Sequence, residues 1–266
     1  METTRGQTKS RGLRGWKGAI FLLCLIGLWE MVARLHLVSA LYFPPMSKNM
    51  GVFYRLTVDG TLPLQVLLSF GRMFGGYFLA IALMVPLGLA MGLFRFCFNT
   101  FEPLVESFRP LCPPAIIPVV MLFLGIGDSM KMFVVFYACS FPILLNTIDG
   151  VRNVDVVLVN TARTFGLSRL AIIRKVVLPA ASPQIMSGLR ISLPISLIVV
   201  IVSEMIGSTN GIGHFILLNQ RTFNVPETYA GVIMVAMVGY LLNRLFLGFD
   251  RRFMHWHRGW SAEQAG

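Results

Sequence analysis

Charged residues are scarce in this sequence: they make up 13% of its 266 residues, about half the usual share in soluble domains, while 55% of the residues are hydrophobic. A soluble protein of this length has too little interior to bury so much apolar surface in one core. A lipid bilayer accepts such surface, because its hydrocarbon is itself apolar. The formal net charge is +11, and the basic residues lie between the apolar runs. This placement is expected for segments beside membrane spans that contact anionic headgroups, and not for a nucleic-acid-binding surface. The composition therefore predicts one integral membrane domain.

Motifs for catalysis, metal binding and nucleotide binding are also missing from the sequence. The four cysteines are far apart and form no C-x-x-C pair, so we expect neither a disulfide framework nor a cysteine metal site. There is no G-x-x-x-x-G-K-[ST] phosphate loop, no H-E-x-x-H motif and no Ser-His-Asp order. We therefore expect no catalytic residue, no metal site and no cofactor bound by this chain, and any ATP would be handled by another chain.

Six apolar segments are long enough to cross about 30 Å of hydrocarbon as helices. We place them at 18–36, 67–94, 104–125, 132–149, 185–206 and 228–249, in an all-α polytopic membrane protein. The third segment should be kinked or partly unwound, because several prolines fall in or beside it and each removes a backbone donor. In domain terms, residues 1–18 form a basic tail, 19–249 the transmembrane domain, and 250–266 a second tail.

Lysine and arginine predict the orientation, because the cytoplasmic loops of membrane proteins are enriched in them. With the amino terminus inside, the inner segments 1–18, 95–109, 149–184 and 250–266 hold 15 of the 23 basic residues, and the outer segments hold 4. Both termini are therefore predicted to be cytoplasmic.

The inner segment 149–184 is too long for a passive turn between two spans. Asp155 is suited to cap a short amphipathic helix from Val156 to Phe165. Gly166 is suited to end that helix in a left-handed conformation. The segment therefore predicts a helix that lies on the inner surface of the membrane.

A second helix with a basic face is expected after the glycine. Ser168 can cap it, and Pro179 and Pro183 are expected to stop it before the fifth span. Physical chemistry alone leaves two alternatives open: an interfacial helix pair that rests on anionic lipid, or a docking element for a cytoplasmic partner.

The same segment contains Asn160-Thr161-Ala162, three residues, Gly166, nine residues and Val176-x-Leu178-Pro179. This run resembles the EAA loop of binding-protein-dependent ABC importer permeases, which has the form E-A-A, three residues, G, nine residues, I-x-L-P. The spacing is the same throughout, although Asn160 and Thr161 replace the first Glu and Ala. The resemblance implies an ATPase-coupling loop whose residues are Asn160, Thr161, Ala162, Arg163, Gly166, Val176, Leu178 and Pro179.

Other motifs extend the resemblance over most of the chain. They are S-x-x-R-x-x-x-G at 69–76, I-P at 117–118, F-x-G-I-G at 123–127, F-P-x-x-x-N-T at 141–147, G-L-R at 188–190, E-M-I-G at 204–207 and G-I-G at 211–213. Together they resemble the subfamily for sulfonates, taurine, nitrate and related small solutes. The resemblance implies a permease subunit of an ATP-driven importer in the bacterial inner membrane, carrying a small anionic solute and not itself an enzyme.

The resemblance also implies partners. Two copies of the chain would form the translocation path within the lipid, two ATP-binding subunits would hold the ATP and dock on the inner loops, and an extracytoplasmic binding protein would deliver the solute. Closure of the ATP-binding subunits would move the loop, and the loop would move the helices between two packed states. No nucleic acid is expected as a partner.

Small residues fall on one face of the segment 185–206, over roughly 80° of arc. This face has two open interpretations: close helix packing, or a narrow and mildly polar wall of the translocation path. The candidate path residues are Gly188, Ser192, Ser196, Ser203 and, near the outer end, Glu204.

Glu204 is expected to pair with Arg221 or Lys131, in either a structural or a substrate-linked role, because an unpaired carboxylate is costly in a membrane. We expect Arg72 to snorkel to the interface and Asp128 to be a solvated turn residue.

Two rival classes are a stand-alone secondary transporter or channel, and a membrane-embedded enzyme. The first places ionisable residues or broken helices at the membrane centre for ion coupling, and this sequence has almost no acids there. The second needs a cluster of ligands or nucleophiles, which is missing. Both rivals are therefore less favoured than an importer subunit.

Overall fold

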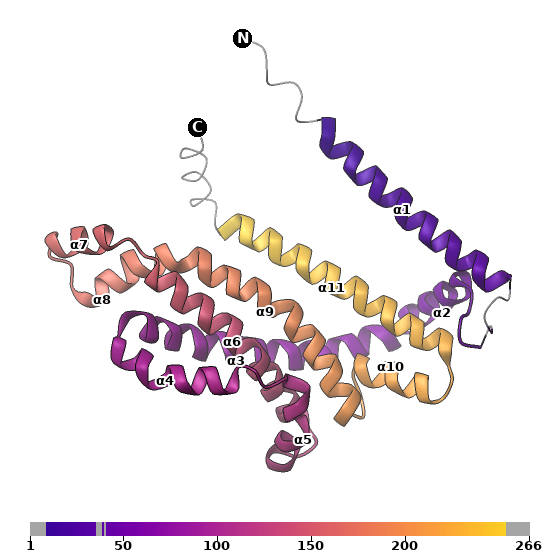
Figure 1. The fold of residues 1–266 in the computed structure, drawn as a ribbon. Helices are drawn as coiled ribbons and strands as arrows, with labels where there is room; N and C mark the ends of the chain where they lie inside the picture. The colour runs from indigo at the N-terminus through magenta and orange to yellow at the C-terminus, as the bar shows by residue number, and fades with distance from the viewer. Residues whose placement is uncertain (1–8, 36–38, 40, 254–266) are drawn as a thin grey trace, which may run out of the picture. The chain divides into compact units, whose positions relative to one another are not determined.

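The computed structural model describes residues 9–35, 39 and 41–253, and within them every regular element is helical (Figure 1). The all-α expectation is therefore confirmed. The ends of the two expected tails, 1–8 and 254–266, lie outside the described residues. In order, the helices are α1 (Lys9–Arg34), α2 (Met46–Val58), α3 (Thr61–Leu93), α4 (Arg95–Phe108), α5 (Pro113–Leu124), α6 (Asp128–Arg152), α7 (Val156–Thr164), α8 (Arg169–Ile172), the π-helical turn η1 (Ile173–Val177), α9 (Leu178–Gly207), α10 (Ile212–Arg221) and α11 (Val225–Phe253).

Four of the described helical segments are long and apolar enough to cross a membrane: Thr61–Leu93, Asp128–Arg152, Arg169–Gly207 and Val225–Asp250. A fifth crossing is counted if α4 and α5, which meet at a bend of 100°, form one broken span. The first expected segment, 18–36, is helical as far as Arg34 within α1. The described residues thus form a polytopic helical protein.

The broken pair is the third expected segment, 104–125, and the irregularity predicted for it is present. Pro113 and Pro114 are the first two residues of α5, where backbone amides have no partner within the helix and proline is tolerated. Gly125 follows the helix with φ of 71°, a conformation that favours glycine. The prolines therefore start a new helix and do not merely bend an old one.

The chain divides into two compact units, each described here by itself. The first consists of residues 1–62 and 215–234, and the second of residues 63–214 and 235–266. In the first unit, the Trp29 ring stacks on Phe43 at 4.4 Å, and its indole N–H donates to the Pro44 carbonyl at 3.2 Å. Arg55 of α2 pairs with Glu227 of α11 at 3.4 Å.

The core of the second unit is built around α6, which packs along α9 and also against α5 (Figure 1). Buried side chains from four helices meet there, including Met73, Ala80, Ile117, Val134, Ile143, Leu193 and Val200. α3 approaches α6 closely at several glycines: for example, a Cβ on Gly88 would lie 2.7 Å from the Thr147 Cβ, and one on Gly92 would lie 2.6 Å from the Val151 Cβ. Small residues therefore bring these two spans together, as they do in other membrane bundles.

The prediction that Pro179 and Pro183 stop a helix before the fifth span is wrong. α8, η1 and α9 form one continuous apolar helix from Arg169 to Gly207, 39 residues long. The π-helical turn ends at Val177, two residues before Pro179, and it contains Lys175, whose carbonyl would clash with the Pro179 ring in a regular α-helix. The Pro179 carbonyl, which Pro183 cannot bond, accepts a hydrogen bond from the Ser182 hydroxyl at 2.9 Å. Local rearrangement thus compensates for both prolines.

Candidate functional site

α7 has well-defined ends. The Asp155 carboxylate accepts a hydrogen bond from the Val157 amide at 2.8 Å, which caps the amino end as predicted. At the other end, Gly166 has φ of 72° and donates to the Arg163 carbonyl at 2.9 Å, while Leu167 donates to the Ala162 carbonyl at 3.2 Å. These two bonds form a Schellman motif, which closes a helix through a left-handed residue. The predicted helix–glycine–helix arrangement is therefore present.

One face of α7 is anchored to the ends of the spans. Ala162 is 5% exposed and packs in an apolar cluster with Val151 of α6, Ile172 of α8, Val177 of η1 and Ala181 of α9. Any larger or charged side chain at position 162 would disturb this contact. The position of α7 is thus tied to the start of the long helix Arg169–Gly207.

Outside this contact, α7 and the residue that follows it present apolar side chains outward. Val156 is 68% exposed, Val157 67% and Phe165, directly after the helix, 81%. Several exposed apolar side chains beside polar ones are typical of an interaction surface. Of the other predicted loop residues, Asn160, Thr161, Arg163, Gly166 and Leu178 are exposed, while Val176 and Pro179 are half-buried.

The small-residue face of α9 lies inside the second unit. The Ser192, Ser196 and Ser203 side chains are fully buried, and their hydroxyls donate to carbonyls three or four residues earlier in the same helix. Gly188 faces α6, where an added Cβ would meet the Asn146 Cβ at 2.8 Å and the Pro142 carbonyl oxygen at 2.9 Å. This geometry agrees with the close-packing interpretation, and a role in the translocation path stays a prediction.

Glu204 lies in a buried ionic cluster, and its partner is neither Arg221 nor Lys131. Its carboxylate accepts a charged hydrogen bond from Arg72 Nη1 at 2.7 Å, two contacts from the Ser69 hydroxyl at 2.8 and 2.9 Å, and one from the Gly213 amide at 3.0 Å. The side chain of Glu204 has no exposed surface, so these contacts replace its hydration.

The expectation that Arg72 snorkels is wrong. Its side chain is 4% exposed and bridges two carboxylates, Glu204 and, through Nε at 2.7 Å, Asp128. Asp128 is the first residue of α6 and 61% exposed, so it is solvated as expected, yet it is also an ion-pair partner. Lys131 completes the cluster with a 3.4 Å contact to Asp128. The cluster thus contains two cationic and two anionic side chains, so its net charge is zero.

The cluster also holds the segment between α9 and α10. Arg72 donates to the Asn210 carbonyl at 3.1 Å and also binds the Asn210 side chain. The Gly211 amide donates to Gln65 at 2.6 Å, and the Ile212 amide donates to the Ser69 hydroxyl at 3.0 Å. Side chains of α3 therefore satisfy the Gly211 amide and the first amide of α10, while Glu204 of α9 satisfies the second, that of Gly213.

Sequence reasoning missed Gln65, Ser69 and Asn210 as members of this cluster. A usable signal was present: Gln65, Ser69 and Arg72 are spaced i, i+4 and i+7, which places three polar residues on one face of an otherwise apolar helix. Polar residues that recur at this spacing in a membrane span indicate a buried partner.

Comparison with known proteins agrees with this architecture. Residues 84–255 match the family described as binding-protein-dependent transport system inner membrane component. The chain is 29% identical over 241 residues to the taurine transport system permease protein of Escherichia coli (strain K12), covering 89% of this chain and 88% of that one. It is 30% identical over 236 residues to the nitrate import permease protein of Leptolyngbya laminosa, covering 87% and 84%.

Among solved structures, an inward-facing methionine ABC transporter aligns with a TM-score of 0.66 over 74% of this chain and 97% of that chain, at 17% identity. This structural similarity shows the fold alone. The match to the family, at residues 84–255, covers more than half of the chain. The chain therefore belongs to the family of binding-protein-dependent transport system inner membrane components, and it is a membrane-spanning permease subunit of an ABC importer.

Proposed function

We propose that this permease moves a small solute with an oxyanion group, such as a sulfonate, taurine or nitrate, across the bacterial inner membrane. Two copies form the path, two ATP-binding subunits dock on the cytoplasmic loops, and an extracytoplasmic binding protein delivers the solute. The chain itself binds no cofactor, and the ATP belongs to the docked subunits. Both termini lie in the cytoplasm, in agreement with the excess of lysine and arginine in the inner segments.

The observation that carries this proposal is the two-sided character of α7. Its inner face is anchored through Ala162, and its outer face offers Val156, Val157 and Phe165 to a partner. The loop residues from Asn160 to Pro179 belong to this docking element. An ATP-binding subunit with an apolar cleft would bury these side chains, and burial of a valine or phenylalanine contributes about 1.5–3 kcal/mol.

A movement of α7 can be transmitted into the membrane through the helix that begins beside it. The continuous helix Arg169–Gly207 begins beside α7 and carries Glu204 near its far end. At about 1.5 Å per residue the 39 residues extend about 60 Å, which is longer than the hydrocarbon layer. A tilt imposed at the α7 end is therefore transmitted as a rigid-body movement to the outer end.

The solute class rests on the relatives. The taurine and nitrate permeases carry different molecules, yet both solutes contain an oxyanion group. We propose that permeases of this kind have translocation paths with similar polar groups, and that the separate binding protein selects the solute.

The experiment is reconstitution of the permease in vesicles with its ATP-binding subunit and binding protein. Uptake of labelled taurine and nitrate is measured with ATP inside the vesicles, beside a cationic amino acid as the control solute. We expect uptake of taurine or nitrate that requires both ATP and the loaded binding protein. Uptake without ATP-binding subunits would instead support a stand-alone transporter or channel. ATP-driven uptake of the cationic amino acid alone would refute the proposal that the solute carries an oxyanion group.

A further inference from the structure

The segment between α3 and α6 has to cross the membrane, because these two helices run in the same direction. Gly76 of α3 lies against Val135 of α6, and farther along both helices Gly92 lies against Val151. Both helices are candidate spans, so the chain that leaves α3 returns across the membrane before α6 begins. α4 and α5, which meet at the bend of 100°, therefore form one crossing together (Figure 1).

α4 reaches deep into this crossing, antiparallel to α6. The Phe98 ring centroid lies 3.6 Å from the guanidinium of Arg152, the last residue of α6. The Phe108 carbonyl, at the other end of α4, accepts a hydrogen bond from the Tyr137 hydroxyl at 2.6 Å. Tyr137 lies nine residues after the start of α6 and 15 before its end, which is about 14 Å and about 22 Å along the helix. The end of α4 and the bend that follows it, residues 109–112, therefore lie well inside a hydrocarbon layer of about 30 Å.

One face of α4 carries charges at this depth. Glu102, Glu106 and Arg109 fall within about 60° of arc, because successive residues of a helix are about 100° apart. All three residues are exposed. The ion pair between Glu106 and Arg109 is 3.7 Å long, and the two side chains are 62% and 55% exposed. The charged face of α4, formed by these three residues, is therefore left uncovered by the rest of the unit.

The backbone beside this face is irregular. Pro103 has no amide hydrogen, so it cannot donate to the Asn99 carbonyl, its partner in a regular helix. The residues of the bend are exposed as well. Irregular backbone occurs at membrane depth only where protein covers it or where it lines a water-filled cavity, and charged side chains are costly in hydrocarbon for the same reason. The charged face of α4 and the bend therefore do not face lipid.

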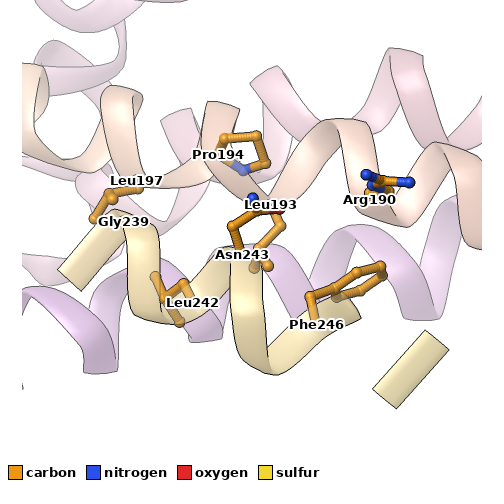
Figure 2. A pocket seen from close by; sticks show the side chains of 8 residues that line it. All are labelled: Arg190, Leu193, Pro194, Leu197, Gly239, Leu242, Asn243 and Phe246. Atoms are coloured by element: carbon orange, nitrogen blue, oxygen red, sulfur yellow. The ribbon is translucent and has the colours of Figure 1, made fainter. Parts of the chain in front are cut away.

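Another polar place in this unit is closed. Arg190 and Asn243 stand among apolar side chains at a pocket between α9 and α11, and the volume of this pocket is about 40 Å³ (Figure 2). A cavity needs about 10–15 Å³ for one water molecule, so this pocket holds a few waters and is no passage for a solute. The charged face of α4, by contrast, is open over about 10 Å along the helix.

We propose that the charged face of α4 and the bend form a wall of the water-filled translocation path. This inference rests on the proposed function, because it assigns the path of that function to particular residues. Two alternatives would use the same face differently. It could pack without water against a second copy of the chain, or it could lie in the aqueous layer at the inner surface, and the test separates both from a path wall.

The test measures the reactivity of single cysteines in a cysteine-free chain within the reconstituted complex. Glu106→Cys probes the charged face. Leu104→Cys is the matched control, because Leu104 is 53% exposed at nearly the same depth but lies about 160° away around the helix. Thiols react as thiolates, which form readily in water and poorly in apolar surroundings. We expect Glu106→Cys to react with a charged, water-soluble thiol reagent at least about tenfold faster than Leu104→Cys, a factor that corresponds to one pKa unit of the thiol. After denaturation in SDS, the two variants should react equally.

A second arm compares two states of the transport cycle. With a non-hydrolysable ATP analogue and loaded binding protein present, the reaction of Glu106→Cys with reagent on the cytoplasmic side should be lost, because the path then opens to the other side. Equal reaction in both states would place α4 at the inner surface. Reaction no faster than that of Leu104→Cys would place the face in a dry contact between two copies, and either result overturns the proposal.

Two provisions keep the outcomes distinct. If Glu106→Cys fails to insert, Glu102→Cys, one turn earlier on the same face, replaces it. The comparison of Glu106→Cys with Leu104→Cys needs no solute. Failure of the unchanged complex to import taurine or nitrate would therefore refute the proposed solute class, whereas equal reactivity of the two cysteines would refute the path wall.

Discussion

Replacement of Arg72 by methionine tests the buried ionic cluster most directly. The change removes the cation that binds Glu204 at 2.7 Å while it keeps an unbranched apolar chain in the same space. Glu204 is fully buried, and the nearby Lys131 contacts Asp128 and not Glu204. The carboxylate is therefore left without a cation, although Ser69 and the Gly213 amide still donate to it.

The expected magnitude follows from the burial of the pair. Removing one partner of a buried ion pair costs about 3–5 kcal/mol, because the other charge stays desolvated. For a protein of this size about 1 kcal/mol corresponds to about 2–4 °C, so Arg72→Met should lower the unfolding temperature by about 6–20 °C. Glu204→Gln should cost less, about 1–3 kcal/mol, because the amide keeps hydrogen bonds and Arg72 keeps Asp128.

Thermal unfolding of the purified permease in detergent, followed by circular dichroism, measures both changes. Arg109→Gln is the matched control, since its pair with Glu106 is 3.7 Å long and more than half exposed on both sides, and such pairs contribute at most about 1 kcal/mol. The double variant Arg72→Met with Glu204→Met should be more stable than Arg72→Met alone, because no buried charge is left unpaired. If Arg72→Met shifts the transition no further than Arg109→Gln, the cluster does not stabilise the fold.

Three further predictions concern coupling, the path and topology. Gly166→Val should cost roughly 1–2 kcal/mol locally, because its φ of 72° is left-handed, and should reduce ATPase stimulation and co-purification of the ATP-binding subunit; unchanged values of both would contradict the coupling assignment. Ser196→Trp should block uptake in a protein that still inserts, because the site is fully buried, whereas Ser196→Ala should be nearly silent, since such a hydrogen bond averages about 0.6 kcal/mol; normal uptake with tryptophan would remove this face from the path. Single cysteines at Ser10 and Asn219 of a cysteine-free protein should react with impermeant thiol reagents from the inside and the outside, respectively, and labelling of position 219 only from the cytoplasm would reverse the topology.

Features determined by neighbouring residues could be predicted from the sequence. Span positions depend on runs of apolar residues, and Asp155, Gly166 and Ser168 act on backbone groups within a few positions of themselves. The helix–glycine–helix arrangement was therefore predictable. The family pattern, which the chain keeps at most positions, led to the same loop by an independent route.

The predictions that were wrong depended on a long-range contact or a backbone adjustment, and neither can be inferred from the spacing of residues in the sequence. Pro179 was expected to stop a helix, but the π-helical turn before it relieves the clash, so α9 continues without a break. Arg72 was expected at the interface because a lone arginine in an apolar helix usually extends to the headgroups. The partner that prevents this, Glu204, is 132 residues away in the sequence.

The sequence by itself therefore determined the membrane class and the local geometry of α7, because hydropathy and capping act over a few residues. The six spans and their direction stay predictions, and the described residues contain four candidate spans, or five with the bent pair. Only the tertiary structure decided which charges pair, that the small residues of α9 face α6, and that Arg190 and Asn243 meet at one pocket. These features depend on which faces of distant helices pack together. Packing is a collective property of the whole bundle, in which each close contact requires all the others.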